Sequence, residues 1–140
     1  MVSGPYNFER FTEAQDPVYE TAHAELRQGQ KTGHWMWFIF PQLKGLGHSH
    51  LASWFGISSL EEAQAYLRHS TLGSRLIDCT KLVTNIEEQT IEQILGNPDD
   101  LKFRSSMTLF AQATPDNQVF EDALQKYFGG QYDPLTLERL

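Results

Sequence analysis

The sequence predicts an all-α protein, an irregular or orthogonal bundle of about seven helices with a buried aromatic segment. Three observations support this prediction: capping residues followed by proline, apolar residues spaced three and four apart, and very little strand-like alternation. Only residues 35–40 read as a strand, and one isolated strand has no partner with which to pair. The 140 residues contain no linker-like or repetitive stretch, which indicates a single domain over residues 1–140.

Three Asp-Pro or Asn-Pro pairs mark expected helix starts, because the first side chain can cap a helix whose first residue is the proline. The pairs are Asp16-Pro17, Asn97-Pro98 and Asp133-Pro134. We expect the first to open a helix that ends at Gly29, the second to open a long helix reaching about Ala113, and the third to open a short C-terminal helix.

Four further helices follow from the helical spacing of apolar residues. Ser58 and Glu61 have the spacing of a capping box at the start of one of them. Cys79 lies on the apolar face of another, so we interpret this lone cysteine as a small core residue and not as a nucleophile. The expected ranges are 58–67, 72–83, 91–95 and 114–128.

The most unusual segment is the apolar run from Trp35 to Phe40, which holds two of the three tryptophans. Six consecutive apolar residues leave no solvent-facing side at either a helical or a strand period. His34 and Gln42 flank the run with polar groups that need partners if they are buried with it. The run is therefore either a core segment or the wall of an aromatic pocket with polar groups at its mouth.

Charge is distributed unevenly along the chain. The formal net charge of -7 argues against a nucleic-acid duplex as the partner, because such binding needs an excess of Lys and Arg. Between Glu25 and Glu61 there is no Asp or Glu, so this acid-free interval carries +3 against -10 elsewhere. Its basic residues are Arg27, Lys31 and Lys44, with His34, His48 and His50. An anion is expected to be drawn here, with a chance scatter of charges as the alternative.

Several function classes find no support in the sequence. No apolar run is long enough to span a membrane, and residues 1–11 lack the regions of a secretory signal, so with one cysteine we expect a cytoplasmic protein. His48-Ser49-His50 lack the companions that a metal site requires, and Gly45-Leu46-Gly47 lacks the spacing of a phosphate loop. We therefore expect neither a metal nor a cofactor, and the sequence leaves the oligomeric state open.

Residues 99–110 form the second unusual stretch. Ser105 and Ser106 weaken a helix interior, so their hydroxyls either bond back to backbone carbonyls or face a polar cavity. Asp100 and Arg104 have the spacing of an ion pair on a helix surface. The alternative is that one basic group, from Lys102 or Arg104, and one hydroxyl face an anionic ligand.

These motifs resemble those of the uncharacterised bacterial family called domain of unknown function 1810, and the match runs essentially from end to end. The motifs are Phe8-Glu9-Arg10-Phe11 with Ala14-Gln15, the segment from His34 to Gln42, Gly45-Leu46-Gly47, and the segment from Asp100 to Phe110. The family has no established activity to carry over. Some members are labelled calpastatin-like, but this chain has nothing that would inhibit a calcium-dependent protease. The arrangement of the chain also looks like small α-helical domains linked to NAD and ADP-ribose.

The leading hypothesis is a small domain that binds an anionic planar molecule, of the nucleotide or ADP-ribose class, beside the aromatic segment. Indoles would stack on the planar group, cationic side chains would meet phosphate, and amide or hydroxyl groups would add hydrogen bonds. The candidate binding residues are Lys31, Trp35, Trp37, Gln42, Lys102, Arg104, Ser105 and Ser106. If the domain is an enzyme, we expect hydrolysis or glycosidic cleavage with His34 or Glu20 as the acid-base group. The alternative is a protein-protein interaction module without catalysis, which would present a flat apolar surface.

Overall fold

The computed structural model describes residues 6–140 and confirms the all-α prediction. Over this range it contains ten helices and no strand, with one isolated parallel bridge between Leu43 and Ile57. Residues 1–5, which belong to the stretch where we expected no secretory signal, lie outside the described residues. The helices are α1 (Glu9–Gln15), α2 (Tyr19–Gln28), α3 (Met36–Ile39), α4 (His50–Trp54), α5 (Leu60–Arg68), α6 (Leu72–Thr84), α7 (Ile91–Leu95), α8 (Asp99–Ala113), α9 (Gln118–Phe128) and α10 (Pro134–Arg139).

Three short helices, α1, α3 and α4, account for the difference between the seven expected helices and the ten observed. The aromatic run that read as a strand coils into the single turn of α3. Its backbone bonds are local, from Ile39 N-H to the Trp35 carbonyl and from Phe40 N-H to the Met36 carbonyl, both at 3.1 Å. A buried segment must satisfy its own backbone groups, and a helical turn does so where no neighbouring strand is available.

Of the three Asp-Pro or Asn-Pro pairs, one lies at the start of a helix as expected, and two lie shortly before the observed start. Asp133 accepts a hydrogen bond from the Thr136 N-H at 3.1 Å, and Pro134 is the first residue of α10. The N-cap of α2 is Val18 and that of α8 is Pro98, and neither makes a side-chain capping bond. These two helices therefore start one or two residues later than the capping pattern predicted.

Most other expected ends agree with the structure to within one or two residues, but α9 begins only at Gln118 and not near residue 114. At α5 the cap is Ser59, not Ser58, and its hydroxyl accepts from the Glu62 N-H at 3.1 Å. Gly29 ends α2 with φ of 81° and Gly129 ends α9 with φ of 63°. Both are left-handed conformations that glycine adopts without steric cost, as the sequence predicted.

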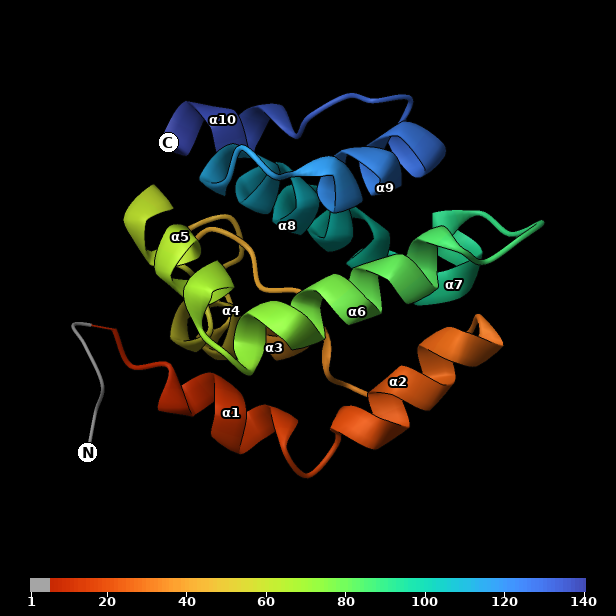
Figure 1. Ribbon diagram of the computed structural model, residues 1–140, viewed down its shortest axis with the longest axis horizontal. Coiled ribbons are helices and arrows are strands. Elements are labelled where there is room, and N and C mark those ends of the chain that lie inside the picture. The colour runs from red at the N-terminus through yellow and green to blue at the C-terminus, as the bar shows by residue number, and fades with distance from the viewer. Residues whose placement is uncertain (1–5) are drawn as a thin grey trace.

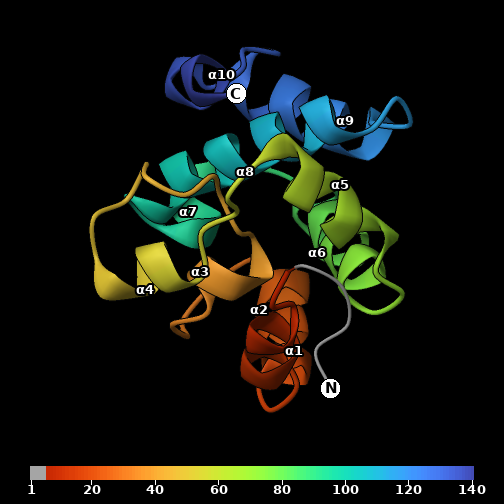
Figure 2. The same ribbon diagram turned by 90° about the vertical axis from the view of Figure 1, so that its left-hand side faces the viewer.

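The central element is α8, which packs against α5, α7, α9 and α10. Both views place it inside the molecule, with α9 and α10 on one side and α1 and α2 at the opposite edge (Figures 1 and 2). α6 crosses the front of Figure 1 and packs against α2, α5 and α9. The aromatic turn α3 packs against α1 and α6.

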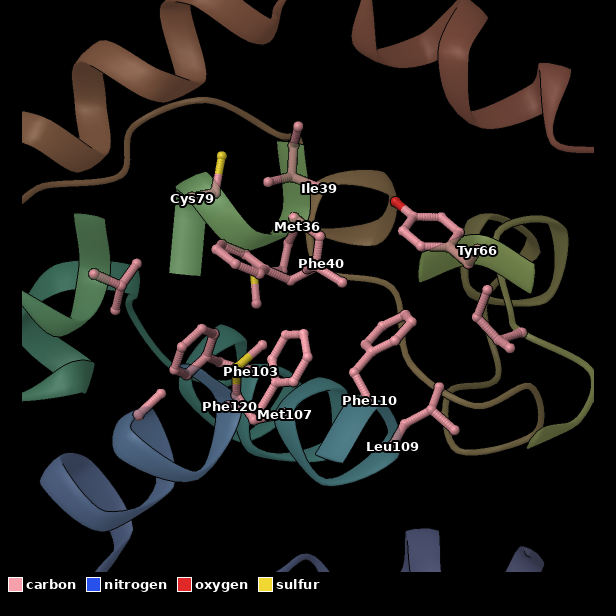
Figure 3. Close-up of a cluster of buried hydrophobic side chains, with 14 of the residues drawn as sticks. Met36, Ile39, Phe40, Tyr66, Cys79, Phe103, Met107, Leu109, Phe110 and Phe120 are labelled. Atoms are coloured by element: carbon pink, nitrogen blue, oxygen red, sulfur yellow. The ribbon is translucent and has the colours of Figure 1, made fainter. Parts of the chain in front are cut away.

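Aromatic side chains from α3, α5 and α8 meet in the core (Figure 3). Phe40 and Phe103 lie edge to face with their ring centroids 5.0 Å apart, and Tyr66 lies 5.4 Å from Phe110. Burial raises the pKa of Cys79 to about 12, and this residue is fully buried, which confirms the prediction of a core cysteine. Most of the expected aromatic segment is therefore core.

A helix can span a membrane only if it is long and apolar enough to cross the hydrocarbon layer. Over residues 6–140, none of the helices is both long enough and apolar enough to span a bilayer.

We predict that Phe110→Ala lowers the free energy of unfolding by about 3 to 5 kcal/mol, because it removes a fully buried ring and leaves a cavity between Tyr66 and Phe120. Urea denaturation followed by far-ultraviolet circular dichroism measures this change. Leu135→Ala is the control, since that side chain is 60% exposed and should change stability by no more than about 0.5 kcal/mol. Similar losses for the two variants would contradict the central position of α8.

Candidate functional site

One carboxylate fixes the loop that leads into the aromatic turn. Glu25, near the end of α2, accepts three hydrogen bonds on Oε1: from Thr32 N-H at 2.8 Å, Gly33 N-H at 2.9 Å and the Trp35 indole N-H at 3.0 Å. Burial alone would raise the pKa of Glu25, but these hydrogen bonds outweigh it and hold the pKa below its ordinary value. The Trp35 ring, 2% exposed, is thereby fixed in the core.

Next to this loop, the Asp99 carboxylate forms ion pairs with two lysines. Asp99, the first residue of α8, lies 2.8 Å from the Lys31 ammonium and 3.5 Å from that of Lys102. Each ammonium also lies over an indole, Lys31 at 5.2 Å from the Trp35 ring centroid and Lys102 at 5.1 Å from that of Trp37. We call these five residues the Lys-Trp cluster. Within the cluster the two cations share one anion, and the Glu25 carboxylate that accepts from the Trp35 indole lies beside it.

A narrow crevice adjoins the Lys-Trp cluster. Its lining residues are Met36, Trp37, Phe40, Gln42, Ala52, Phe55 and Lys102. Its volume is about 10 Å³, which is room for about one water molecule. The structure therefore brings Trp37, Gln42 and Lys102 together, but around a gap too small for a planar ligand while Lys102 lies over Trp37.

Arg104 binds the C-terminal segment of the chain. Its Nε donates to the Gln131 carbonyl at 3.1 Å and its Nη2 to the Tyr132 carbonyl at 2.9 Å. The expected pair with Asp100 is not among the ion pairs of the described residues, and Asp100 accepts instead from the Asn97 amide at 2.9 Å. Arg104 therefore has a structural role that is independent of any ligand.

The two serines of α8 are both buried. The Ser105 hydroxyl lies 3.2 Å from the Leu101 carbonyl and 3.1 Å from the Asp133 carboxylate, so the back-bonding interpretation holds for this residue. The Ser106 hydroxyl is fully buried and has no hydrogen-bond partner among the described residues. Neither serine lines the crevice beside Trp37.

The two candidate acid-base residues are both exposed. Glu20 lies in the first turn of α2 and lines a shallow hollow together with Tyr19 and His23. His34 lies in the loop between α2 and α3, and no hydrogen bond joins it to Glu20 in the part of the chain that the structure describes. Their catalytic role stays a prediction.

The sequence analysis did not single out a buried ion pair between α1 and α5. Arg10 Nη2 lies 3.0 Å from the Glu62 carboxylate, and the two side chains are only 9% and 3% exposed. The other Glu62 oxygen accepts from the backbone N-H and the hydroxyl of Ser58, at 2.8 and 2.6 Å. The one available signal was Arg10 within the first family motif. The pair borders a hollow of about 370 Å³ lined also by Tyr6, Asn7, Lys44, His50, Ser53, Trp54, Gly56 and Ser58.

A metal site needs several ligand side chains close to one another. Within residues 6–140, no three His, Cys, Asp or Glu side chains gather in a group that would hold a metal ion.

Comparison with known proteins places the chain in a family. The family model described as Protein of unknown function (DUF1810) matches residues 5–140. The chain belongs to this family. The chain is also similar to a solved structure, that of the conserved hypothetical protein Rv1873 from Mycobacterium tuberculosis. The two sequences are 58% identical, the TM-score is 0.97, and the match covers 98% of each chain. A search of the curated proteins found no match. DUF1810 membership confirms the resemblance seen in the motifs and brings no activity with it.

We predict that Glu25→Gln destabilises the protein at neutral pH and that the difference from wild type disappears in acid. The pKa of Glu25 is lowered by folding, so its contribution is complete above the unfolded value of about 4.3 and is lost as pH falls through the lower folded value. At pH 7 the loss should be roughly 1 to 3 kcal/mol, as expected for hydrogen bonds to a charged acceptor. Urea unfolding at a series of pH values measures it.

Glu20→Gln is the matched control, because Glu20 is an exposed carboxylate on the same helix. It should leave stability within about 0.5 kcal/mol of wild type at every pH. A Glu25→Gln deficit that stays constant from pH 7 to acid would show that the charge of Glu25 does not stabilise the loop.

Proposed function

We propose that the protein binds an anionic, planar small molecule of the nucleotide or ADP-ribose class at the Lys-Trp cluster. The observation that carries the proposal is the sharing of one carboxylate, Asp99, by two lysines that each cover an indole. Lys102 is the more exposed of the two cations, and a ligand phosphate would give its ammonium an anion of its own. Trp37 is the indole that a ligand would meet, since Trp35 is closed off in the core.

Ligand entry requires Lys102 to leave the face of Trp37. Its side chain is 26% exposed, and its distance of 3.5 Å from Asp99 makes this the longer of the two ion pairs. A partly exposed ion pair and a cation-π contact are each worth about 1 kcal/mol or less, so moving the ammonium costs little. A ligand phosphate would offset that cost by pairing with the displaced ammonium, while the planar group takes its place on the indole. Gln42, at the crevice, would then supply a directional hydrogen bond.

An interaction module without catalysis is the second candidate, and one observation favours it. Large apolar side chains are exposed on and beside the C-terminal helix: Leu101, Leu135, Leu137 and Leu140 are between 42% and 60% exposed. Exposed apolar side chains are typical of protein-binding surfaces where they form one contiguous patch. The two candidates differ in location, because these leucines belong to α8, α10 and the C-terminus and not to the crevice.

Hydrolysis or glycosidic cleavage would need an acid-base group beside the ligand. His34 and Glu20 are the proposed groups, and the geometry adds no support for them, since neither lines the crevice. A cytoplasmic location and a single domain over residues 1–140 are likewise proposals that rest on composition.

We predict that AMP or ADP-ribose raises the melting temperature and changes the Trp37 fluorescence of a Trp54→Phe protein, in which the half-exposed third tryptophan no longer contributes. Lys102→Met keeps the apolar stem and removes the charge, so it should weaken binding about tenfold or more. Fluorescence titration and thermal unfolding measure both effects.

Lys81→Met is the matched control, because Lys81 is an exposed lysine on α6, away from the crevice. It should bind as the parent does. If AMP and ADP-ribose move neither the fluorescence nor the melting temperature at about 1 mM, the interaction-module candidate is preferred.

A further inference from the structure

The hollow beside the Arg10-Glu62 pair and the crevice beside Trp37 lie on opposite faces of α4. Ala52 and Phe55 line the crevice, whereas His50, Ser53 and Trp54 line the hollow. Residues spaced three and four apart share a helix face, so α4 separates the two cavities. At about 370 Å³, the hollow is large enough for a small ligand without any movement of side chains.

The Arg10-Glu62 pair fixes the side of the hollow formed by α4. Arg10 Nε donates to the Trp54 carbonyl at 2.8 Å, and its Nη2 contacts the Gly56 carbonyl at 3.2 Å as well as Glu62. Glu62 in turn holds Ser58. The two charges cancel, and their hydrogen-bonding groups are used, so Arg10 and Glu62 position the hollow and leave ligand binding to its other residues.

Among the described residues, the rim carries one unpaired cation, Lys44, and one imidazole, His50. Lys44 and His50 line the hollow, both are exposed, and within residues 6–140 neither takes part in an ion pair. Glu62 is the only acidic residue among those that line it. In a chain of net charge -7, a hollow whose unpaired charge is positive selects for anions.

An aromatic ring lies beside this charge. The Trp54 side chain is 50% exposed, although a large aromatic residue is usually well buried. Trp54 and Ser53 both line the hollow, so an exposed indole and a hydroxyl are available to a ligand there. A cation, a hydroxyl and an exposed indole together fit a ligand with a compact anion at one end and a flat ring at the other.

We propose that this hollow binds a small aromatic phosphate monoester, with the phosphate at Lys44, His50 and Ser53 and the ring on Trp54. The inference concerns a different surface from the Lys-Trp cluster and does not rest on the function proposed there. The hollow is open and shallow compared with a site for a dinucleotide, so one ring and one phosphate are the size that it accommodates.

The sign of the electrostatic potential at the hollow can be tested by quenching Trp54 fluorescence with an anion, iodide, and with a cation, caesium. Trp35 is buried and Trp37 is half-buried, so the readily quenched signal should come from Trp54 and should be lost in Trp54→Phe. Relative to free N-acetyltryptophanamide, we expect iodide to quench roughly two to three times more effectively than caesium, as one unpaired cation at close range implies. Lys44→Met should remove this preference and Lys81→Met should keep it. Equal or better quenching by caesium would overturn the proposal.

Protection from iodide tests the ligand class. Phenyl phosphate at millimolar concentration should reduce quenching of the wild type at least twofold more than inorganic phosphate or phenol at the same concentration and ionic strength. The protection should be lost in Lys44→Met and unchanged in Lys102→Met, which separates this hollow from the Lys-Trp cluster. No protection by phenyl phosphate, or equal protection by phenol, would overturn the assignment of a phosphate monoester.

Discussion

The burial of α8 is the constraint on which the rest of the structure depends. Ten of its fifteen residues are buried, so this helix cannot follow the usual pattern of one apolar face and one solvated face. Its aromatic residues form the centre of the core, and its buried polar groups, apart from the Ser106 hydroxyl, have partners within the chain where the structure describes them. Arg104 and Thr108 find them in the segment before α10, where Thr108 accepts from the Asp133 N-H at 2.9 Å. Asp99 finds them in Lys31 and Lys102.

The sequence predicted all the long helices of the described residues, and also the short α7 and α10, but it missed the short α1, α3 and α4. Helical spacing over ten or more residues identifies a buried face, and glycine in a left-handed conformation marks the end, as at Gly29 and Gly129. The turn α3 has only four residues, all apolar, so no spacing distinguishes it from a strand. Its conformation is set by the core that it fills, and this information is spread over the whole chain.

Three of the eight predicted binding residues line one crevice, and ligand binding there stays a prediction. The sequence indicated that Trp37, Gln42 and Lys102 belong together, and they line one crevice. It did not indicate that Asp99 would hold two of the cations, because Lys31 lies 68 positions away in the chain. Arg104 was interpreted as a ligand group because an arginine beside hydroxyls suits phosphate. Its actual carbonyl partners lie 27 and 28 residues further on, beyond what helix spacing reveals.

Contacts between distant parts of the chain determine how much of the positive charge in the acid-free interval stays unpaired. The interval has no carboxylate of its own, yet three carboxylates from outside it bind its groups: Glu25 holds the loop before Trp35, Asp99 holds Lys31, and Glu62 holds Ser58. Of the three cations in the interval, however, only Lys31 is paired with a carboxylate in the part of the chain that the structure describes. Arg27 and Lys44 are in no ion pair among the described residues, but Arg27 lines a hollow that the Glu20 carboxylate also lines, whereas Lys44 lines the hollow beside Trp54. A charge imbalance in sequence can attract a ligand only where folding leaves it unpaired, and this is why the proposed phosphate site lies at Lys44.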